Sequence, residues 1–214
     1  MRFIQYDREK WDTRYRDAAS PGDPARVLTE FAHLLPTTGR ALDLACGLGA
    51  NALFLAARGL EVHAWDLSSV AIERLAHGAR ARGLTVRAEV RDVVAAPPDP
   101  GLFDVIVVAH FLERSLAPAI ADALRPGGLL YYQTWTRTRV DETGPRNDAY
   151  RLEDGELLRL FTGLPEETPG AAGAGSSGRA PFPRLRVLAY REEGRVGDLT
   201  RGFRNEAMLV AQRV

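Results

Sequence analysis

Short apolar segments alternate with helical segments between residues 40 and 135, and this alternation limits the folds open to the chain. Strands are expected at 40–46, 60–65, 84–90, 103–109 and 129–135. The helices expected between them cover 50–58, 70–82 and 119–124. Such alternation predicts right-handed βαβ units and a mostly parallel sheet. Because ligands of these sheets bind beyond the carboxyl ends of the strands, functional residues are expected just after them.

The segment before this region is expected to be helical. Residues 6–19 mix aromatic and charged side chains, which predicts a short helical arm, assigned to 1–22. Apolar residues follow at helical spacing over 24–35. The length of 214 residues predicts one domain over 1–214.

The last third of the chain has a different character. A helix is expected at 152–161, and two strands at 185–190 and 207–212 are expected to be antiparallel at the sheet edge. Between them, residues 163–183 are rich in Gly, Ala, Ser and Pro. This composition predicts a flexible insertion, because it offers little apolar surface to bury.

Composition and charge exclude several classes of function. The 28 basic and 28 acidic side chains cancel, which argues against nucleic acid or an anionic membrane as the main partner. Cys46 is the only cysteine, so an intrachain disulfide and a cysteine-rich metal site are excluded, and no metal is expected. The first residues lack a signal-peptide core, and no run reaches the ~18 apolar residues of a membrane span. A cytoplasmic monomer or homodimer with a small-molecule substrate is expected.

The strongest local signal is an acid, a glycine turn and a helix in immediate succession. Asp43 precedes Gly47 and Gly49, where a missing Cβ lets the backbone approach a ligand closely. The spacing Gly47-x-Gly49-x-x-Ala52 also fits the dinucleotide fingerprint. Asp66 ends the next strand, where a carboxylate holds ribose hydroxyls in either ligand class. Asp43 separates the classes, because it would repel a pyrophosphate and attract an ammonium group such as that of S-adenosylmethionine.

With this turn, five motifs in order resemble class I S-adenosylmethionine-dependent methyltransferases. They are 43–49, Asp66, Arg91-Asp92-Val93, the strand 103–108 and the turn 124–128. The resemblance covers residues 40–135. It implies S-adenosylmethionine as cofactor and S-adenosylhomocysteine as product, with Asp66 at the ribose and Asp92 at the adenine edge.

A narrower resemblance, to the tellurite-resistance and thiopurine methyltransferase group, covers most of the chain. Its motifs are Trp11-Asp12-x-Arg14-Tyr15, Phe111-Leu112-x-Arg114, Gln133-Thr134-Trp135 and the segment 144–158. It implies an α/β fold with a Rossmann-like seven-stranded sheet in the order 3-2-1-4-5-7-6. The last strand is then antiparallel, helices cover both faces, and the N-terminal arm covers the cofactor. Many relatives carry a glutamate at the position of Gln133.

The resemblance implies two sets of site residues. Those expected to hold the cofactor are Trp11, Arg14, Asp43, Gly47, Gly49, Asp66, Leu67, Asp92, Val93 and Ala109. Those expected near the methyl acceptor are Tyr15, Arg114, Trp135, Arg146 and Tyr150, whose arginines would suit an anion. His110, directly after the fourth strand, is the candidate general base.

Structural interpretations of the same residues stay open at this point. Asp43 could be a structural acid at a strand end, and Asp92 a surface acid. Asp66 could act as the N-cap of the helix at Ser68. His110 could be a wall of the pocket that stacks on the cofactor.

These observations predict a methyltransferase acting on a small molecule, with a tellurite- or selenite-like oxyanion or a thiol as acceptor. The reaction is an in-line displacement, so the protein's work is alignment and exclusion of water. An oxygen or nitrogen acceptor would additionally need His110 as a base. One alternative is a non-catalytic cofactor-binding protein of the same fold. The other is a nicotinamide-dependent oxidoreductase, which is disfavoured because Lys10, the only lysine, leaves no Tyr-x-x-x-Lys pair.

Overall fold

One mixed sheet runs through the part of the chain that the structure describes. The computed structural model describes residues 2–163 and 185–214. Within them seven strands lie in the order β3-β2-β1-β4-β5-β7-β6, which confirms the predicted α/β fold. The strands are β1 (Arg40–Leu44), β2 (Glu61–Asp66), β3 (Val86–Val90), β4 (Phe103–Ala109), β5 (Leu124–Trp135), β6 (Leu185–Glu192) and β7 (Glu206–Arg213).

The strand register brings the ends of the central strands together. β1 to β5 are parallel, whereas β7 is antiparallel to both β5 and β6. Leu44 at the end of β1 pairs with Trp65 of β2 and with Val108 of β4. The segments that follow β1, β2 and β4 therefore leave the sheet at one edge, where such folds bind ligands.

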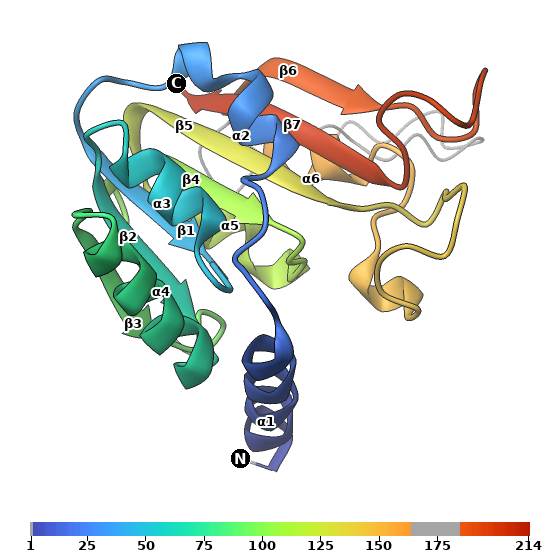
Figure 1. Ribbon diagram of the computed structural model, residues 1–214. Helices are drawn as coiled ribbons and strands as arrows, with labels where there is room; N and C mark the ends of the chain where they lie inside the picture. Colours follow the sequence, from blue (N-terminus) through green and yellow to red (C-terminus); the bar gives the residue numbers. More distant parts are fainter. Residues whose placement is uncertain (1, 164–184) are drawn as a thin grey trace.

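Helices cover both faces of the sheet, and one helix lies beyond its edge (Figure 1). The front layer in Figure 1 contains α2 (Arg26–Glu30), η1 (Ala32–Leu34), α3 (Ala50–Ala56) and α4 (Ser69–Ala81). The opposite layer contains η2 (Arg114–Leu116), α5 (Ala117–Ala123) and α6 (Glu156–Thr162). The two remaining helices are α1 (Arg2–Asp17), beyond the carboxyl ends of the parallel strands, and η3 (Asp148–Tyr150).

β4 illustrates how the sheet is buried on both faces. Val105 and Val107 pack into the core with α2, α3 and α4, whereas Ile106 and Val108 pack into the core with α5 and α6. All four side chains are fully buried. Successive side chains of a strand point to opposite faces, and burying each of these gains about 1.5–3 kcal/mol. This accounts for the continuous apolar run in a central parallel strand.

The helix predicted over 24–35 is interrupted at Phe31. Phe31 has φ −108° and ψ 25°, and it separates α2 from η1. Its carbonyl accepts a hydrogen bond of 3.2 Å from Tyr131 Oη in β5. The same carbonyl accepts from Leu34 N at 3.0 Å, so a 3-10 turn and a tertiary contact together replace continued α-helical bonding.

The starts of β5 and α6 also differ clearly from the prediction. β5 begins at Leu124, which pairs with Phe103, so the expected turn at 126–128 is an irregularity within the strand. α6 begins at Glu156 and not at Leu152, because Leu152 forms a bridge with Thr136. The insertion predicted at 163–183 lies outside the described residues, apart from Gly163. None of the helices described here is both long and apolar enough to cross a membrane.

Arg151 organises the segment that follows β5. Its side chain is fully buried. Nε donates to Pro145 O at 2.7 Å, Nη1 to Thr136 O at 2.8 Å, and Nη2 to Thr143 O at 2.5 Å. The guanidinium thus replaces water for three carbonyls that have no strand partner, and it shapes the loop from 136 to 150.

Replacement of Arg151 by alanine is expected to lower the free energy of unfolding by about 3 kcal/mol, because buried carbonyls lose a charged donor. For a chain of this size the melting temperature should fall by roughly 6–12 °C. The matched control is Arg146→Ala in the same loop, where the side chain is exposed. A change of equal size in both variants, measured by thermal unfolding, would contradict the assigned role.

Candidate functional site

The turn after β1 is built on residues with positive φ. Ala45, Gly47 and Gly49 have φ of 56°, 53° and 79°, and Gly49 is the N-cap of α3. A Cβ on Gly47 would lie 2.9 Å from Tyr15 Oη, and one on Gly49 would overlap Leu75 of α4. Both positions therefore need glycine, for conformation and for space.

Asp43 links this turn to α3 through hydrogen bonds from its carboxyl group. Its carboxyl is almost fully buried; Oδ2 accepts from Ala52 N at 2.9 Å and Oδ1 from Asn51 Nδ2 at 3.4 Å. Burial raises the pKa of Asp43 to about 8, so the group is mainly neutral at pH 7. Asn51 Oδ1 in turn accepts from Ala25 N at 2.8 Å, which ties the turn to the segment before α2.

Asp66 braces the same turn from β2. Oδ2 accepts from Gly47 N at 2.8 Å and Oδ1 from Ser68 N at 2.9 Å. Burial raises the pKa of Asp66 as well. The interpretation of Asp66 as the N-cap of the following helix is wrong. Ser68 is the N-cap of α4, because its Oγ accepts from Ala71 N at 3.1 Å, whereas Asp66 still belongs to the strand.

The residues after β3 lie next to Asp66. Arg91 N donates to Asp66 O at 2.8 Å, which brings the following Asp92 and Val93 to the same edge. Asp92 Oδ1 accepts from Val94 N at 3.0 Å and from Ala95 N at 3.2 Å, so it closes its own turn. Val93 is buried. Leu67, partly buried, follows Asp66 directly.

The arm α1 docks on α4 beside the glycine turn. Asp12 Oδ1 accepts from Ser68 Oγ at 2.5 Å and from Val70 N at 3.3 Å. Arg74 donates to Tyr15 O and, at 2.7 Å, to Ala18 O. The Tyr15 hydroxyl consequently sits over Gly47, and burial raises its pKa above the ordinary value.

The other aromatic and basic residues expected in the arm surround Tyr15. Trp11 stacks on Tyr15 with ring centroids 5.7 Å apart, and the Arg14 guanidinium lies 5.3 Å from the Trp11 ring. Arg14 is exposed. The arm thus lies beside the turn, as the narrower resemblance implies, and Asp12, which was not among the predicted site residues, holds it there.

A second group of side chains lies across the edge from Asp43, after β4. His110 follows Ala109 and stacks on Trp135, with ring centroids 4.7 Å apart and planes inclined by 19°. His110 Nε2 lies 3.2 Å from Glu206 Oε1 at the start of β7. Glu206 Oε2 accepts from Gln133 Nε2 at 2.5 Å.

The residues expected near the methyl acceptor lie in different parts of the structure. Trp135 lies beside His110, and Tyr15 lies over Gly47. Arg114 is committed to Glu156, with its Nε at 2.5 Å and its Nη2 at 3.0 Å from the carboxylate oxygens. Arg146 and Tyr150 lie exposed on the loop that Arg151 shapes. The expected basic cluster is therefore not assembled as one anion-binding group.

Comparison with known proteins finds a family model that matches part of this chain. Residues 41–128 match the family model of a methyltransferase domain. The ubiquinone biosynthesis O-methyltransferase of Burkholderia lata is 31% identical over 121 residues, which cover 54% of this chain and 52% of that protein. The chain thus spans about half the length of the curated relatives it matches.

Two solved structures share the fold over nearly the whole chain. TehB from Haemophilus influenzae superposes with a TM-score of 0.65 at 19% identity, covering 97% of this chain and 67% of that one. A SAM-dependent methyltransferase from Methanosarcina mazei gives 0.63 at 19% identity, covering 90% and 99%. Residues 41–128 are thus similar to a methyltransferase domain, and the fold is shared with a SAM-dependent methyltransferase. The Methanosarcina protein is by its name SAM-dependent, which means that it uses S-adenosylmethionine.

The residues of the methyltransferase domain fit this cofactor. The cradle at Gly47 is closed to any Cβ, and within residues 2–163 and 185–214 the buried Asp43 carboxyl has N–H partners and no cation. The matched range contains Asp43, both glycines, Asp66 and Asp92. It does not reach the arm or Glu206.

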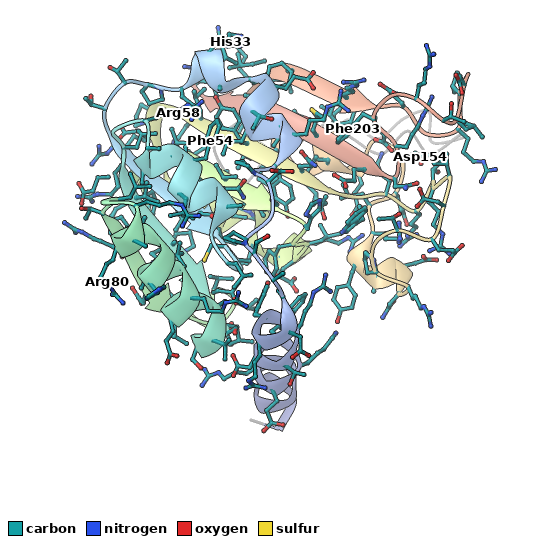
Figure 2. The ribbon with its side chains drawn as sticks, viewed as in Figure 1. His33, Phe54, Arg58, Arg80, Asp154 and Phe203 are labelled. Carbon is teal, nitrogen blue, oxygen red and sulfur yellow. The ribbon has the colours of Figure 1, made fainter. Side chains whose placement is uncertain are left out.

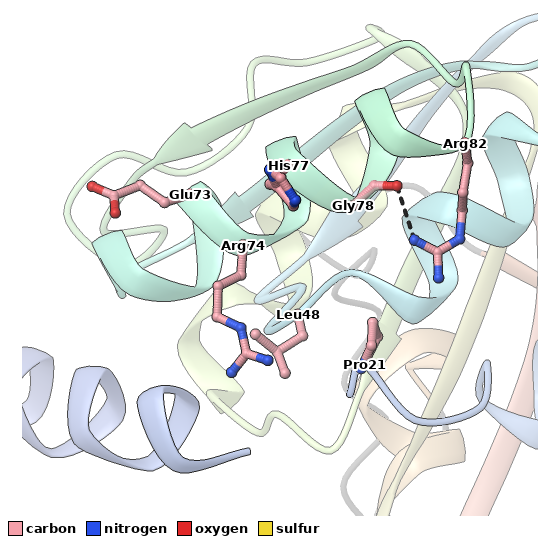
Figure 3. A pocket seen from close by; sticks show the side chains of 7 residues that line it. All are labelled: Pro21, Leu48, Glu73, Arg74, His77, Gly78 and Arg82. Atoms are coloured by element: carbon pink, nitrogen blue, oxygen red, sulfur yellow. Dashed lines mark hydrogen bonds between the residues drawn. The ribbon is translucent and has the colours of Figure 1, made fainter. Parts of the chain in front are cut away.

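A cavity of about 340 Å³ opens beside the glycine turn of the methyltransferase domain, between α4 and the segment after α1 (Figure 3). It is lined by Pro21, Leu48, Glu73, Arg74, His77, Gly78 and Arg82. Arg82 Nη1 bonds to Gly78 O at 2.8 Å, and Arg74 holds the arm. The charged groups of this cavity are thus partly engaged within the fold.

Sequence reasoning missed several residues that build the site. Asn51, Asp12 and Glu206 each reach a partner from a distant element. Asn51 carried a weak signal, because an asparagine near the start of an apolar helix favours side-chain bonds to backbone. The only sequence signal for Glu206 was that an acid stands at the start of a mostly apolar strand.

Replacement of Arg74 by alanine is expected to release α1 without unfolding the domain, because two charge-assisted bonds to the arm are lost. Backbone amides of residues 8–17 should exchange with solvent at least about tenfold faster, at 1.4 kcal/mol per decade. Arg80→Ala is the control, since Arg80 lies on α4 and points away from the fold (Figure 2). Unchanged exchange in the Arg74 variant would show that the arm is held by other contacts.

Proposed function

We propose that the protein transfers a methyl group from S-adenosylmethionine to a small-molecule acceptor. The observation that carries this proposal is the buried carboxyl of Asp43 beside the Gly47 cradle, which has N–H donors but no cationic partner among the described residues. A buried acid without a cation becomes charged when an ammonium group arrives, and the cofactor brings one. The match to a methyltransferase domain supports the same conclusion.

The proposed cofactor residues line one edge of the sheet. Asp66 would take the ribose hydroxyls, and Leu67, Asp92 and Val93 the adenine. The backbone at Gly47, Gly49 and Ala109 would face the rest of the cofactor. Trp11 and Arg14 would contact it from the arm, which closes over the turn and excludes water. Bound there, the cofactor supplies an already activated methyl group on a sulfonium, and the chain's task is alignment.

The class of acceptor rests on separate observations. A net charge of zero and the absence of a basic stripe argue against nucleic acid. The Burkholderia relative is by name an O-methyltransferase, which favours an oxygen acceptor. The resemblance of the Trp11–Tyr15 and Arg114 motifs favours a tellurite- or selenite-like oxyanion or a thiol. Because Arg114 is already paired with Glu156, an oxyanion would find this arginine neutralised.

Cofactor binding is expected to raise the melting temperature. S-adenosylmethionine or S-adenosylhomocysteine at ~100 times its Kd adds about 2.7 kcal/mol. This corresponds to roughly 5–10 °C for a chain of this size. NAD, measured in parallel by differential scanning fluorimetry, should give no shift. A shift with NAD alone would contradict the proposal, and cofactor binding without transfer to any acceptor would favour the non-catalytic alternative.

Cofactor binding at pH 7 is also expected to release close to one proton from Asp43. With a pKa of about 8 the free group is protonated, and a neighbouring ammonium lowers that pKa, so the carboxylate forms on binding. Calorimetric titrations in phosphate and in Tris should differ by the buffers' protonation enthalpies.

Asp43→Asn should abolish this difference between buffers, whereas Asp92→Asn, which keeps the Asp43 carboxyl, should preserve it. Identical heats in both buffers for the unmodified protein would show that Asp43 does not meet the ammonium group.

A further inference from the structure

His110 belongs to a hydrogen-bonded chain that crosses the open edge of the sheet. His110 Nε2 lies 3.2 Å from Glu206 Oε1, and Glu206 Oε2 accepts from Gln133 Nε2 at 2.5 Å. Gln133 Oε1 accepts from Val27 N, in α2, at 2.8 Å. This series of hydrogen bonds therefore starts at a fixed backbone amide and ends at the His110 imidazole.

These hydrogen bonds fix the orientation of the Glu206 carboxylate. The Gln133 amide cannot turn over, because Val27 N–H needs its oxygen and Glu206 needs its NH₂. Gln133 is buried, and the Glu206 side chain is only 12% exposed. The His110 side chain is 44% exposed. One side of the imidazole is thus held by a buried carboxylate, while the ring remains accessible.

The backbone of His110 is also held in a conformation that histidine rarely adopts. Its φ is 56°, in the left-handed region, which is strained for a residue with a side chain. His110 N donates to Gln133 O at 2.8 Å, and the ring stacks on Trp135. Together with the Glu206 contact, these two contacts fix the ring directly after β4, beside the end of β5 and the start of β7. Strain retained in this way is characteristic of functional residues.

The pair has the form of a base and its orienting group. An imidazole that donates Nε2–H to a carboxylate is fixed as one tautomer, with Nδ1 as the proton acceptor. Nδ1 of His110 has no hydrogen-bond partner in the described part of the chain.

We propose that His110 is the general base of the methyl transfer, that Glu206 is its positioning residue, and that the acceptor is a hydroxyl compound. This inference rests on the proposed function. The hydroxyl oxygen forms the new bond to the methyl carbon, and the carbon–sulfur bond breaks with its electron pair passing to sulfur. The hydroxyl proton passes to His110 Nδ1, and the resulting imidazolium is stabilised by the Glu206 carboxylate.

The need for a base selects among the acceptors. A thiol with an ordinary pKa near ~8.5 is partly ionised at neutral pH, whereas a phenolic hydroxyl near ~10 and an alcohol are not. A tellurite- or selenite-like oxyanion already carries its negative charge. Only the hydroxyl gains the roughly 10²–10⁴-fold that a positioned base contributes.

The first test reads the tautomer of His110 without any cofactor. Long-range ¹H–¹⁵N spectra of the protein contain four histidines, and His110 is assigned by its absence from His110→Asn. Asparagine tolerates the positive φ at this position. The unmodified protein should show His110 as the Nε2–H form.

In Glu206→Gln the tautomer should invert. Gln133 still presents NH₂ to position 206, so the new amide must turn its oxygen to Gln133 and its NH₂ to His110, which then becomes Nδ1–H. Glu61→Gln is the matched control, because Glu61 faces another histidine, His63, at 3.7 Å in β2. An unchanged His110 tautomer in Glu206→Gln would overturn the positioning role.

The second test compares acceptors by mass spectrometry: catechol for a hydroxyl, thiophenol for a thiol, and selenite. Both His110→Asn and Glu206→Gln should lower kcat with catechol by about 100-fold or more. They should leave the melting shift with S-adenosylmethionine unchanged, and Glu61→Gln should leave both unchanged. Catechol transfer unaffected by His110→Asn, or transfer to thiophenol or selenite alone, would overturn the proposal.

The two hypotheses fail in distinguishable ways. If the unmodified protein shows no melting shift with S-adenosylmethionine, the proposed function fails. In that case the Glu206→Gln tautomer still supports or refutes the pairing of His110 with Glu206.

Discussion

The turn after β1 depends on hydrogen bonds to two buried carboxyl groups. Asp43 accepts from Ala52 at the start of α3, and Asp66 accepts from Gly47 within the turn. A backbone with positive φ at Gly47 and Gly49 cannot continue a strand ladder, so its N–H groups need other acceptors. The Asp66 carboxyl accepts from Gly47 N, and the Cys46 carbonyl accepts from Gly49 N. The burial that makes these bonds effective also raises the pKa of both acids. The same oxygens therefore hold the turn and, in the proposed function, would meet the cofactor's ammonium group and ribose hydroxyls.

Polar side chains from parallel and antiparallel strands meet at one edge of the sheet. β1, β2 and β4 end at this edge, whereas β7 begins there because it runs antiparallel to β5. Trp135 at the end of β5 pairs with Glu206 at the start of β7. A carboxylate about 100 residues away in the chain is thereby brought to His110. The reversed strand thus supplies the one partner of the imidazole that the parallel part of the sheet does not provide.

Residues with a strong local pattern were predictable. The run Phe103–Ala109 was expected as a strand with its observed bounds, because only a central strand buries both faces so completely. The acid–glycine–helix order around Gly47 likewise predicted the turn. Arg114 illustrates the opposite case. It was expected at the acceptor and instead pairs with Glu156, since nothing in the local sequence tells which carboxylate the fold will place beside it.

The chain's sequence by itself determined the alternation of strands and helices, the glycine turn and the acids at the strand ends. Each of these follows from side-chain periodicity or from the conformational freedom of glycine, which act over a few residues. The tertiary structure decided what each polar group bonds to. Asp12 reaches Ser68, Gln133 reaches Val27, and His110 reaches Glu206, through hydrogen bonds between distant elements. Hydrogen bonds act only over about 3 Å, so their partners exist only once packing has placed the elements together.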